Sequence, residues 1–105
     1  MQGELAEYSR RLRARFGSRV RLVRLFGSWA RGEARPDSDV DVAVVIDGLT
    51  VEEWREALGL SAELVLERED AEPLAPLVLS GDRWVELVRD ERRLARDIEE
   101  QGIPV

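Results

Sequence analysis

Hydrophobic residues near the start of the chain recur at the spacing of one helix face. A glycine follows the last of them, and glycine commonly ends a helix. The pattern predicts an amphipathic helix over residues 4–16. The apolar residues on this face are Leu5, Tyr8, Leu12 and Phe16.

Two apolar runs then predict a pair of strands. Residues 19–26 alternate at first and become apolar on both sides towards their end, and residues 40–46 are apolar apart from Asp41. A Gly-Ser pair breaks the first strand. Its Ser28 is a residue type that caps helices, so a short helix is expected over residues 29–32.

The second half of the chain is predicted to contain one more strand and three more helices. Thr50 is expected to cap a helix over residues 51–58, which the following glycine would end. Residues 62–66 are predicted to form the third strand, residues 74–79 a short helix, and residues 82–100 a final helical segment. The expected organisation is one α/β domain over the whole chain, with a small mixed sheet of three to four strands flanked by helices.

Composition restricts the chemistry available to this domain. The 105 residues contain no cysteine, histidine or lysine. These absences exclude disulfides, thiol nucleophiles, Ser-His-Asp triads, Cys/His zinc sites and lysine-dependent phosphate loops. Carboxylates, hydroxyls, guanidinium groups and bound metal ions remain.

Charge and hydropathy restrict the setting. The net charge of −6 argues against direct nucleic-acid binding, and most of the arginines that precede the Gly-Ser pair are expected on a solvated surface. No apolar run approaches the roughly 18 residues that a membrane span needs. The first residues lack the apolar core of a signal peptide, so a cytoplasmic protein without a membrane partner is expected.

The candidate chemistry begins with two carboxylates. Side chains two residues apart on a strand point to the same face, so Asp39 and Asp41 are expected about 6.5–7 Å apart. Two like charges at this distance repel, and divalent cations such as a pair of Mg²⁺ ions would relieve the repulsion. In a simpler interpretation, Asp39 is a turn residue and Asp41 is exposed at a sheet edge.

A candidate phosphate site precedes these acids. Gly27 permits close approach of an anion to the backbone, and Ser28 adds a hydroxyl at a helix N-terminus. Arg31 could reach a phosphate oxygen or a neighbouring carboxylate. The spacing Gly-Ser-x-x-Arg-Gly-x(5)-Ser-Asp-x-Asp combines both groups in one motif.

This motif resembles the nucleotidyltransferase domain of the DNA polymerase beta superfamily. Within it, the chain is similar to the minimal nucleotidyltransferases that are often encoded beside a helical HEPN protein. The resemblance implies that Gly27 and Ser28 hold the β- and γ-phosphates of ATP, and that Asp39 and Asp41 bind two Mg²⁺ ions. It also implies a third acid on the following strand, where Glu63 stands in place of the usual aspartate. Glu63 is otherwise a solvated strand residue, and Glu67, Glu69 and Asp70 are weaker candidates.

Two functions follow as hypotheses. In the first, the chain transfers AMP to a hydroxyl acceptor, by resemblance a tyrosine of a HEPN toxin, and so acts as an antitoxin in a hetero-oligomer. In the second, it is a weak or inactive module that neutralises the HEPN partner by binding. Trp29, Trp54 and Trp84 are candidate anchors for such binding, with two of the three expected in the core. Transfer to RNA, DNA or an antibiotic fits less well, because such enzymes usually add a substrate-binding domain.

Overall fold

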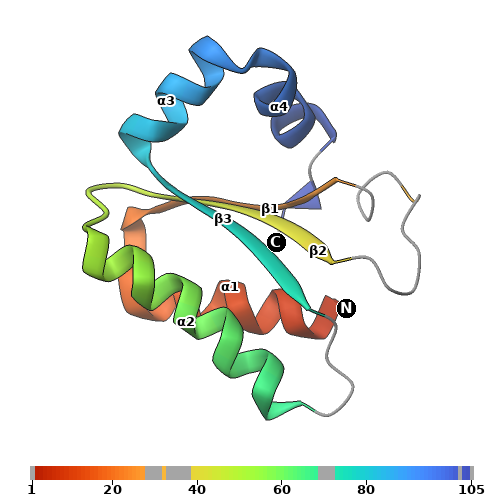
Figure 1. Ribbon diagram of the computed structural model, residues 1–105. Helices are drawn as coiled ribbons and strands as arrows, with labels where there is room; N and C mark the ends of the chain where they lie inside the picture. Colours follow the sequence, from red (N-terminus) through yellow and green to blue (C-terminus); the bar gives the residue numbers. More distant parts are fainter. Residues whose placement is uncertain (1, 28–31, 33–38, 69–72, 102, 105) are drawn as a thin grey trace.

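A mixed β-sheet lies between two layers of helices in the computed structural model (Figure 1). Its strands follow the order β3-β2-β1-β4; β1 is antiparallel to β2 and β4, and β2 is parallel to β3. The structure describes residues 2–27, 32, 39–68, 73–101 and 103–104. The predicted fold class is confirmed. The strands are β1 (Val20–Phe26), β2 (Val40–Ile46), β3 (Leu74–Ser80) and β4 (Ile103–Pro104).

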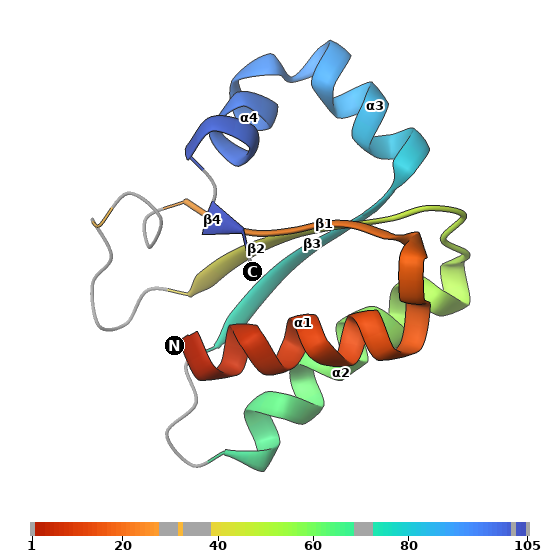
Figure 2. The ribbon, with the colours of Figure 1, turned by 180° about the vertical axis from the view of Figure 1, so that it is seen from behind.

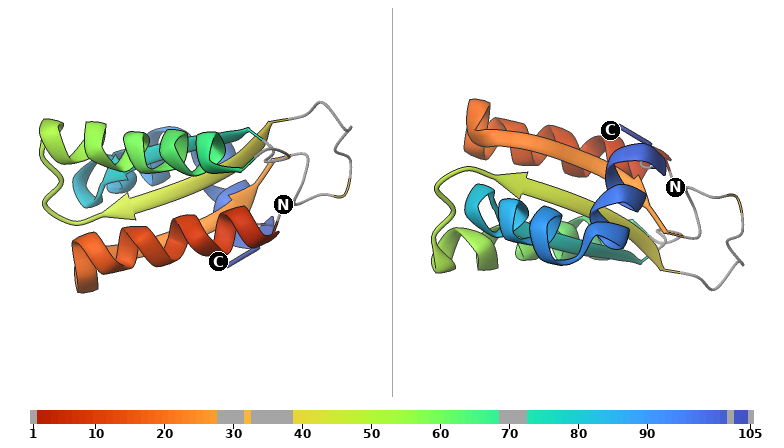
Figure 3. Two further views of the ribbon diagram at one scale, coloured as in Figure 1. Left: turned by 90° about the horizontal axis from the view of Figure 1, so that it is seen from below. Right: turned by 90° about the horizontal axis from the view of Figure 1, so that it is seen from above.

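Two long helices cover one face of the sheet. α1 (Gln2–Phe16) and α2 (Val51–Glu67) lie side by side there, as the view from below shows (Figure 3). They are tied by the buried hydroxyl of Tyr8, which donates a hydrogen bond of 2.9 Å to the Ala57 carbonyl. Burial raises the pKa of this hydroxyl, which therefore stays protonated as a donor. The turn η1 (Gly17–Arg19) leads from α1 into the sheet.

Shorter helical segments cover the other face. These are α3 (Gly81–Asp90), α4 (Arg92–Arg96) and the π-type turn η2 (Asp97–Gln101), which leads back to β4 beside β1 (Figure 2). Together they confirm most of the predicted helical segment over residues 82–100. None of the described helices is both long and apolar enough to cross a bilayer.

Strand β2 is the centre of the domain because both of its faces are buried. Val40, Val42 and two further residues of the same parity pack towards α1 and α2. Ala43 and Val45 pack towards α3 and α4, in a cluster that also contains Trp84. This two-sided burial explains the nearly continuous apolar run of β2, which the sequence analysis placed over the same residues.

The predicted third strand over residues 62–66 is wrong, because α2 continues to Glu67. Thr50 does cap α2, but Gly59 does not end it. Ala57, Ser61 and Leu64 are buried at helical spacing, and their packing outweighs the roughly 1 kcal/mol that a glycine costs inside a helix.

The predicted helix over residues 74–79 is also wrong, because this segment is β3. It pairs with β2 along its whole length, from Val40 opposite Leu74 to Ile46 opposite Ser80. Pro76 disfavours the helical conformation of Ala75, the residue before it, whereas an edge strand tolerates proline. Ser80 then caps α3 by accepting a hydrogen bond of 3.2 Å from the Arg83 amide.

Candidate active site

The candidate site lies where β1 ends and β2 begins, at one end of the sheet. Asp41 is the second residue of β2 and is half-buried, and Asp39 is exposed just before the strand. Asp41 has the parity of Ala43 and Val45, so its side chain belongs to the face that α3 and α4 cover. The structure thus places Asp41 on the same sheet end as Gly27, as the motif predicts.

Gly27 and Asp41 fit together closely. Gly27 has φ +75°, a left-handed conformation that glycine adopts without steric cost. A Cβ atom at this position would lie well under 3.0 Å from the nearest carboxylate oxygen of Asp41 and 3.2 Å from its Cγ. The carboxylate therefore occupies the space that a side chain at position 27 would fill. Glycine is required here for two independent reasons, one conformational and one steric.

The strand register defines the other neighbours of Asp41. Phe26 of β1 and Ala75 of β3 are its Cα partners. Paired residues of adjacent strands share a face, and neighbouring strands lie about 4.8 Å apart. The positions that flank Asp41 across the sheet are therefore an aromatic ring and a methyl group.

The residues present are suited to a divalent cation. Carboxylate oxygens are the ligands that Mg²⁺ prefers, and Asp39 and Asp41 provide two carboxylates near an open end of the sheet. The absence of a side chain at Gly27 leaves room for the Asp41 carboxylate. Within the described part of the chain, no group of three or more acidic, histidine or cysteine residues is placed so that it could hold a metal ion.

Two predicted phosphate ligands, Ser28 and Arg31, lie outside the described residues, as do the expected short helix and Trp29. Their roles stay predictions. The described geometry of the phosphate site is therefore that of Gly27 alone.

Glu63 does not join the aspartates. It is exposed on α2, whose buried residues Ala57 and Leu64 pack on the sheet face opposite to that of Asp41. The prediction that Glu63 lies on the strand beside the acids is therefore wrong. Glu67 lies on the same helix and is bound to Arg11 by a hydrogen bond of 2.6 Å.

The sequence pattern does not identify Ala75, because it predicts a helix over residues 74–79. The strand that follows β2 in the sheet is β3, and its residue opposite Asp41 is Ala75. Pro76 was the available signal, since a proline in the middle of a seven-residue apolar segment argues against a helix. A strand predicted over residues 74–80 would have placed Ala75 beside Asp41.

The end of the chain is held next to this site by Arg24. The Arg24 Nη1 donates to the Glu99 carbonyl at 2.8 Å and to the Ile98 carbonyl at 3.4 Å. A cation at the carbonyl end of a helical segment is favourable. Because β4 pairs with Arg24 and Leu25, this contact keeps the last strand beside the part of β1 that leads into Gly27.

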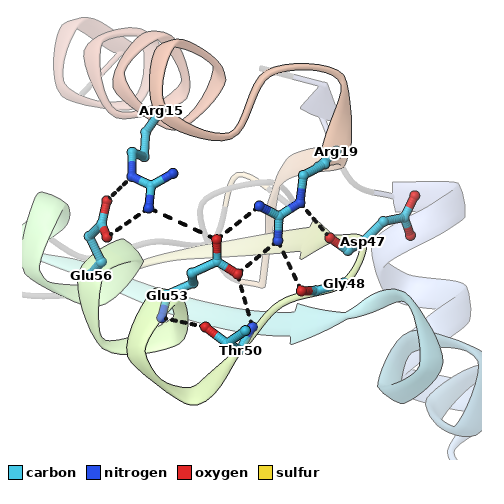
Figure 4. A network of polar contacts seen from close by, with 7 residues as sticks. All are labelled: Arg15, Arg19, Asp47, Gly48, Thr50, Glu53 and Glu56. Atoms are coloured by element: carbon cyan, nitrogen blue, oxygen red, sulfur yellow. Dashed lines mark hydrogen bonds and ion pairs between the residues drawn. The ribbon is translucent and has the colours of Figure 1, made fainter.

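The opposite end of β2 carries a network of charged groups (Figure 4). Arg19 donates two hydrogen bonds of 2.8 Å to the Glu53 carboxylate and two of 2.9 Å to the carbonyls of Asp47 and Gly48. Glu53 also completes a capping box with Thr50 at the start of α2. Hydrogen bonds from Arg19 and then from the Thr50 backbone lower the pKa of Glu53 to about 2. This end of the sheet is a structural junction between β1, β2 and α2.

Comparisons with known proteins agree with the arrangement of Gly27 and Asp41 at the start of β2. The family model described as "Nucleotidyltransferase domain" matches residues 5–102. The chain is 40% identical over 83 residues to Protein adenylyltransferase MntA of Thermococcus cleftensis (strain DSM 27260 / KACC 17922 / CL1). The match covers 71% of this chain and 82% of that protein.

Two crystal structures share the fold. The first is the structure of a protein from Sulfolobus solfataricus that is assigned as a nucleotidyltransferase. It has a TM-score of 0.58 at 20% identity, and the match covers 96% of this chain and 76% of that chain. The other, a toxin-antitoxin with AMP-PNP, has a TM-score of 0.55 at 23% identity and covers 93% of this chain and 69% of its own. With the family model spanning nearly the whole chain and Asp41 set against Gly27 at the end of β1, the protein belongs to the nucleotidyltransferase domain family.

Proposed function

We propose that the chain transfers AMP from ATP to a hydroxyl group of a partner protein, a tyrosine of a HEPN-domain toxin, and thereby acts as an antitoxin. The single observation that carries the proposal is the packing of the Asp41 carboxylate against the backbone of Gly27. The contact supports the proposal because Asp41, the acid that we propose to bind metal, lies beside the turn where the motif would bind phosphate. The relative named as a protein adenylyltransferase supports AMP as the transferred group and protein as the acceptor.

In this proposal, separate residues of the chain would bind the metal ions and the phosphates. Asp39 and Asp41 would hold two Mg²⁺ ions, which supply charge neutralisation for the triphosphate when bound. Gly27 lets the β- and γ-phosphates approach the backbone, and Ser28 and Arg31 would add a hydroxyl and a guanidinium. Catalysis would rest on positioning and on electrostatic stabilisation, without a covalent enzyme intermediate.

The reaction is a displacement at the α-phosphorus. The acceptor oxygen forms a bond to this phosphorus, and the bond from the phosphorus to the oxygen that bridges to the β-phosphate breaks. Pyrophosphate leaves with that electron pair, and the hydroxyl proton is released to water. Water reaches this end of the sheet because Asp39 is exposed.

Label transfer tests the proposal. The chain is incubated with Mg²⁺, ATP labelled at the α-phosphate and a HEPN-domain protein from the same genome. Label is expected on the HEPN protein, and it should disappear when its acceptor tyrosine is changed to phenylalanine or when Asp39→Asn and Asp41→Asn are combined. ATP labelled at the γ-phosphate is the matched control and should leave the protein unlabelled. Equal labelling by the double variant would refute the proposed chemistry.

A second function, neutralisation by binding alone, is favoured by Ala75. A methyl group stands beside Asp41 at the place where a third acid would lie, which weakens the case for rapid turnover. The described residues provide a surface for such binding, because Trp54 is 42% exposed and lines a groove of about 320 Å³ with Val51, Leu79 and Arg83. Trp84, in contrast, is in the core.

Growth rescue separates the two functions. The double asparagine variant and a Trp54→Ala variant are each co-expressed with the toxin. If transfer is the mechanism, the asparagine variant fails to rescue growth. If binding suffices, it rescues as well as the parent does, and Trp54→Ala is the variant that fails.

A further inference from the structure

A basic cluster lies on α4 and consists of Arg92, Arg93 and Arg96. All three side chains are exposed. The two arginines of α3, in contrast, pair with acids of their own helix. Within the described residues, no ion pair involves the three arginines of the basic cluster. The cluster therefore presents its positive charge to solvent.

An apolar strip and a groove adjoin the basic cluster. Val85 and Val88, one turn apart on α3, are 58% and 38% exposed. The groove is lined by residues of α3, α4 and η2, which are Val88, Arg92, Ala95, Arg96, Glu99 and Glu100. Because its two acids belong to η2, the positive charge is concentrated on the α4 side. Exposed apolar side chains beside arginines are typical of protein–protein interfaces, in which arginine is enriched.

The basic cluster is fixed beside the candidate site. Ala95 of α4 packs in the same hydrophobic cluster as Ala43 of β2, on the sheet face to which the Asp41 side chain belongs. β4 follows α4 and η2, and it pairs with Leu25, two residues before Gly27. Figures 1 and 2 show α4 above the end of the sheet at which β1 ends and β2 begins. A protein that brings a hydroxyl group to Asp41 on this face therefore passes next to α4.

We propose that the basic cluster, together with Val85 and Val88, is the docking surface for the acceptor protein, and that the acceptor contacts it with an acidic surface that also carries apolar side chains. This inference rests on the proposed function, because the acceptor is the protein that would receive AMP. The chain has a net charge of −6, so most of its surface repels an acidic partner. A local basic cluster attracts such a partner in one orientation and so fixes the side from which it approaches.

The groove beside Trp54 is less suited to this role because it lies at the opposite end of the sheet. It is lined by Thr50 and Ser80, which cap α2 and α3. Ser80 follows Ala75, the strand partner of Asp41, by five residues, which is roughly 16 Å along β3. Docking beside Trp54 would serve neutralisation by binding alone, whereas docking on α4 would serve transfer.

The experiment measures binding by isothermal titration calorimetry between the full chain and a HEPN-domain protein from the same genome, without ATP or metal ions. Arg96→Glu should raise the dissociation constant at least about 5-fold, and Arg92→Glu combined with it should raise it further. The affinity of the parent chain should fall as salt is added. Arg55→Glu is the matched control, because Arg55 is exposed on α2, on the other side of the sheet, and should leave the affinity unchanged.

Two further double variants separate charge from folding. Arg92→Lys with Arg96→Lys keeps both positive charges and should keep most of the affinity. Arg92→Gln with Arg96→Gln removes the charges without reversing them and should weaken binding less than the double glutamate variant does. If circular dichroism shows that the glutamate variant is unfolded, the comparison of the lysine and glutamine variants decides.

The outcomes also separate docking from chemistry. No binding by the parent chain, equal binding by the folded glutamate variant, or a loss of affinity confined to Trp54→Ala would each overturn the inference. Binding of a single-stranded RNA oligonucleotide that the glutamate variant abolishes would assign the basic cluster to nucleic acid and overturn it as well. A HEPN protein that binds through the basic cluster but receives no label would contradict the proposed function and leave the docking surface intact.

Discussion

Aspartates stand at both ends of β2, and the residues around them differ in kind. Asp47, just beyond one end, lies 3.5 Å from the Arg21 guanidinium and next to the junction of Arg19, Glu53 and Thr50. At the other end, Asp41 is set against the backbone of Gly27, with Phe26 and Ala75 as its paired neighbours. The charges of the first end are neutralised within the fold, which is typical of a structural junction. At the second end, the described neighbours of Asp41 are the backbone of Gly27, Phe26 and Ala75, and the motif predicts a nucleotide site there.

At each end of β2, a glycine lies against an aspartate carboxylate. A Cβ atom on Gly81, the first residue of α3, would overlap Asp47 just as one on Gly27 would overlap Asp41. The Asp47 carboxylate thus lies at the start of α3, where the helix dipole favours negative charge. A close glycine–carboxylate contact is therefore present at both ends of β2, and the contact of Gly27 with Asp41 differs from the other because both residues belong to the Gly-Ser…Asp-x-Asp motif.

The largest expected difference between the ends is in catalysis. Asp41→Asn should lower the rate of AMP transfer by about 1,000-fold or more, because Asp41 in its proposed role as a metal ligand would supply several kcal/mol of transition-state stabilisation. Asp47→Asn is the matched control at the other end and should leave the rate unchanged. Single-turnover transfer of α-phosphate label measures both. A similar loss in the two variants would mean that the ends do not differ in function.

A smaller loss is expected for Gly27→Ala. The methyl group would displace the Asp41 carboxylate, and a misplacement of about 1 Å can cost about 100-fold in rate. Gly17→Ala is the control, because Gly17 has a similar φ of +60° but open space around the added Cβ. Both variants should lose about 1–2 kcal/mol of unfolding free energy from the left-handed backbone. Only Gly27→Ala should lose activity, and unaltered transfer by it would remove Gly27 from the site.

Gly81→Ala should affect stability and not transfer. Its Cβ would displace the exposed Asp47 carboxylate, which can turn away, so the expected cost is the lost contact with the start of α3, about 0.3–1 kcal/mol of unfolding free energy. Gly59→Ala is the opposite control: no atom lies within 4 Å of its added Cβ, so it should stabilise α2 by about 0.5–1 kcal/mol. Urea unfolding measures both changes. Loss of transfer in a folded Gly81→Ala variant would show that the junction contributes to function.

The smallest expected effect is on the pH dependence of thermal stability at the junction of Arg19, Glu53 and Thr50. Arg19 lowers the pKa of Glu53 from 4.5 to about 2, so this contact stabilises the fold fully above pH 4.5 and is lost as the pH falls towards 2. Glu53→Gln should therefore melt below the parent at pH 7 and approach it at pH 2. Glu52→Gln, exposed in the same turn, is the control and should melt close to the parent throughout. A gap between parent and Glu53→Gln that stays the same from pH 7 to pH 2 would contradict this assignment.

The sequence by itself determined the elements whose neighbours in the chain dictate their form. α1 follows from the spacing of Tyr8 and Leu12, and β2 follows from an apolar run buried on both sides. The pairing of Gly27 with Asp41 also follows, because a hairpin-like β1 and β2 necessarily bring the end of one strand to the start of the next.

Only the tertiary structure decided how the second half of the chain is used. Burial of Ala57 and Leu64 against the sheet carries α2 past Gly59, and pairing with β2 makes a strand of Leu74–Ser80. These choices depend on contacts between segments far apart in the sequence, such as Val40 with Leu74 and Tyr8 with Ala57, which local propensity does not register. They move Glu63 to a helix on the far face and put Ala75 beside Asp41. The sequence therefore determined that Gly27 and Asp41 lie together at the candidate site, and packing decided that Ala75 lies beside Asp41.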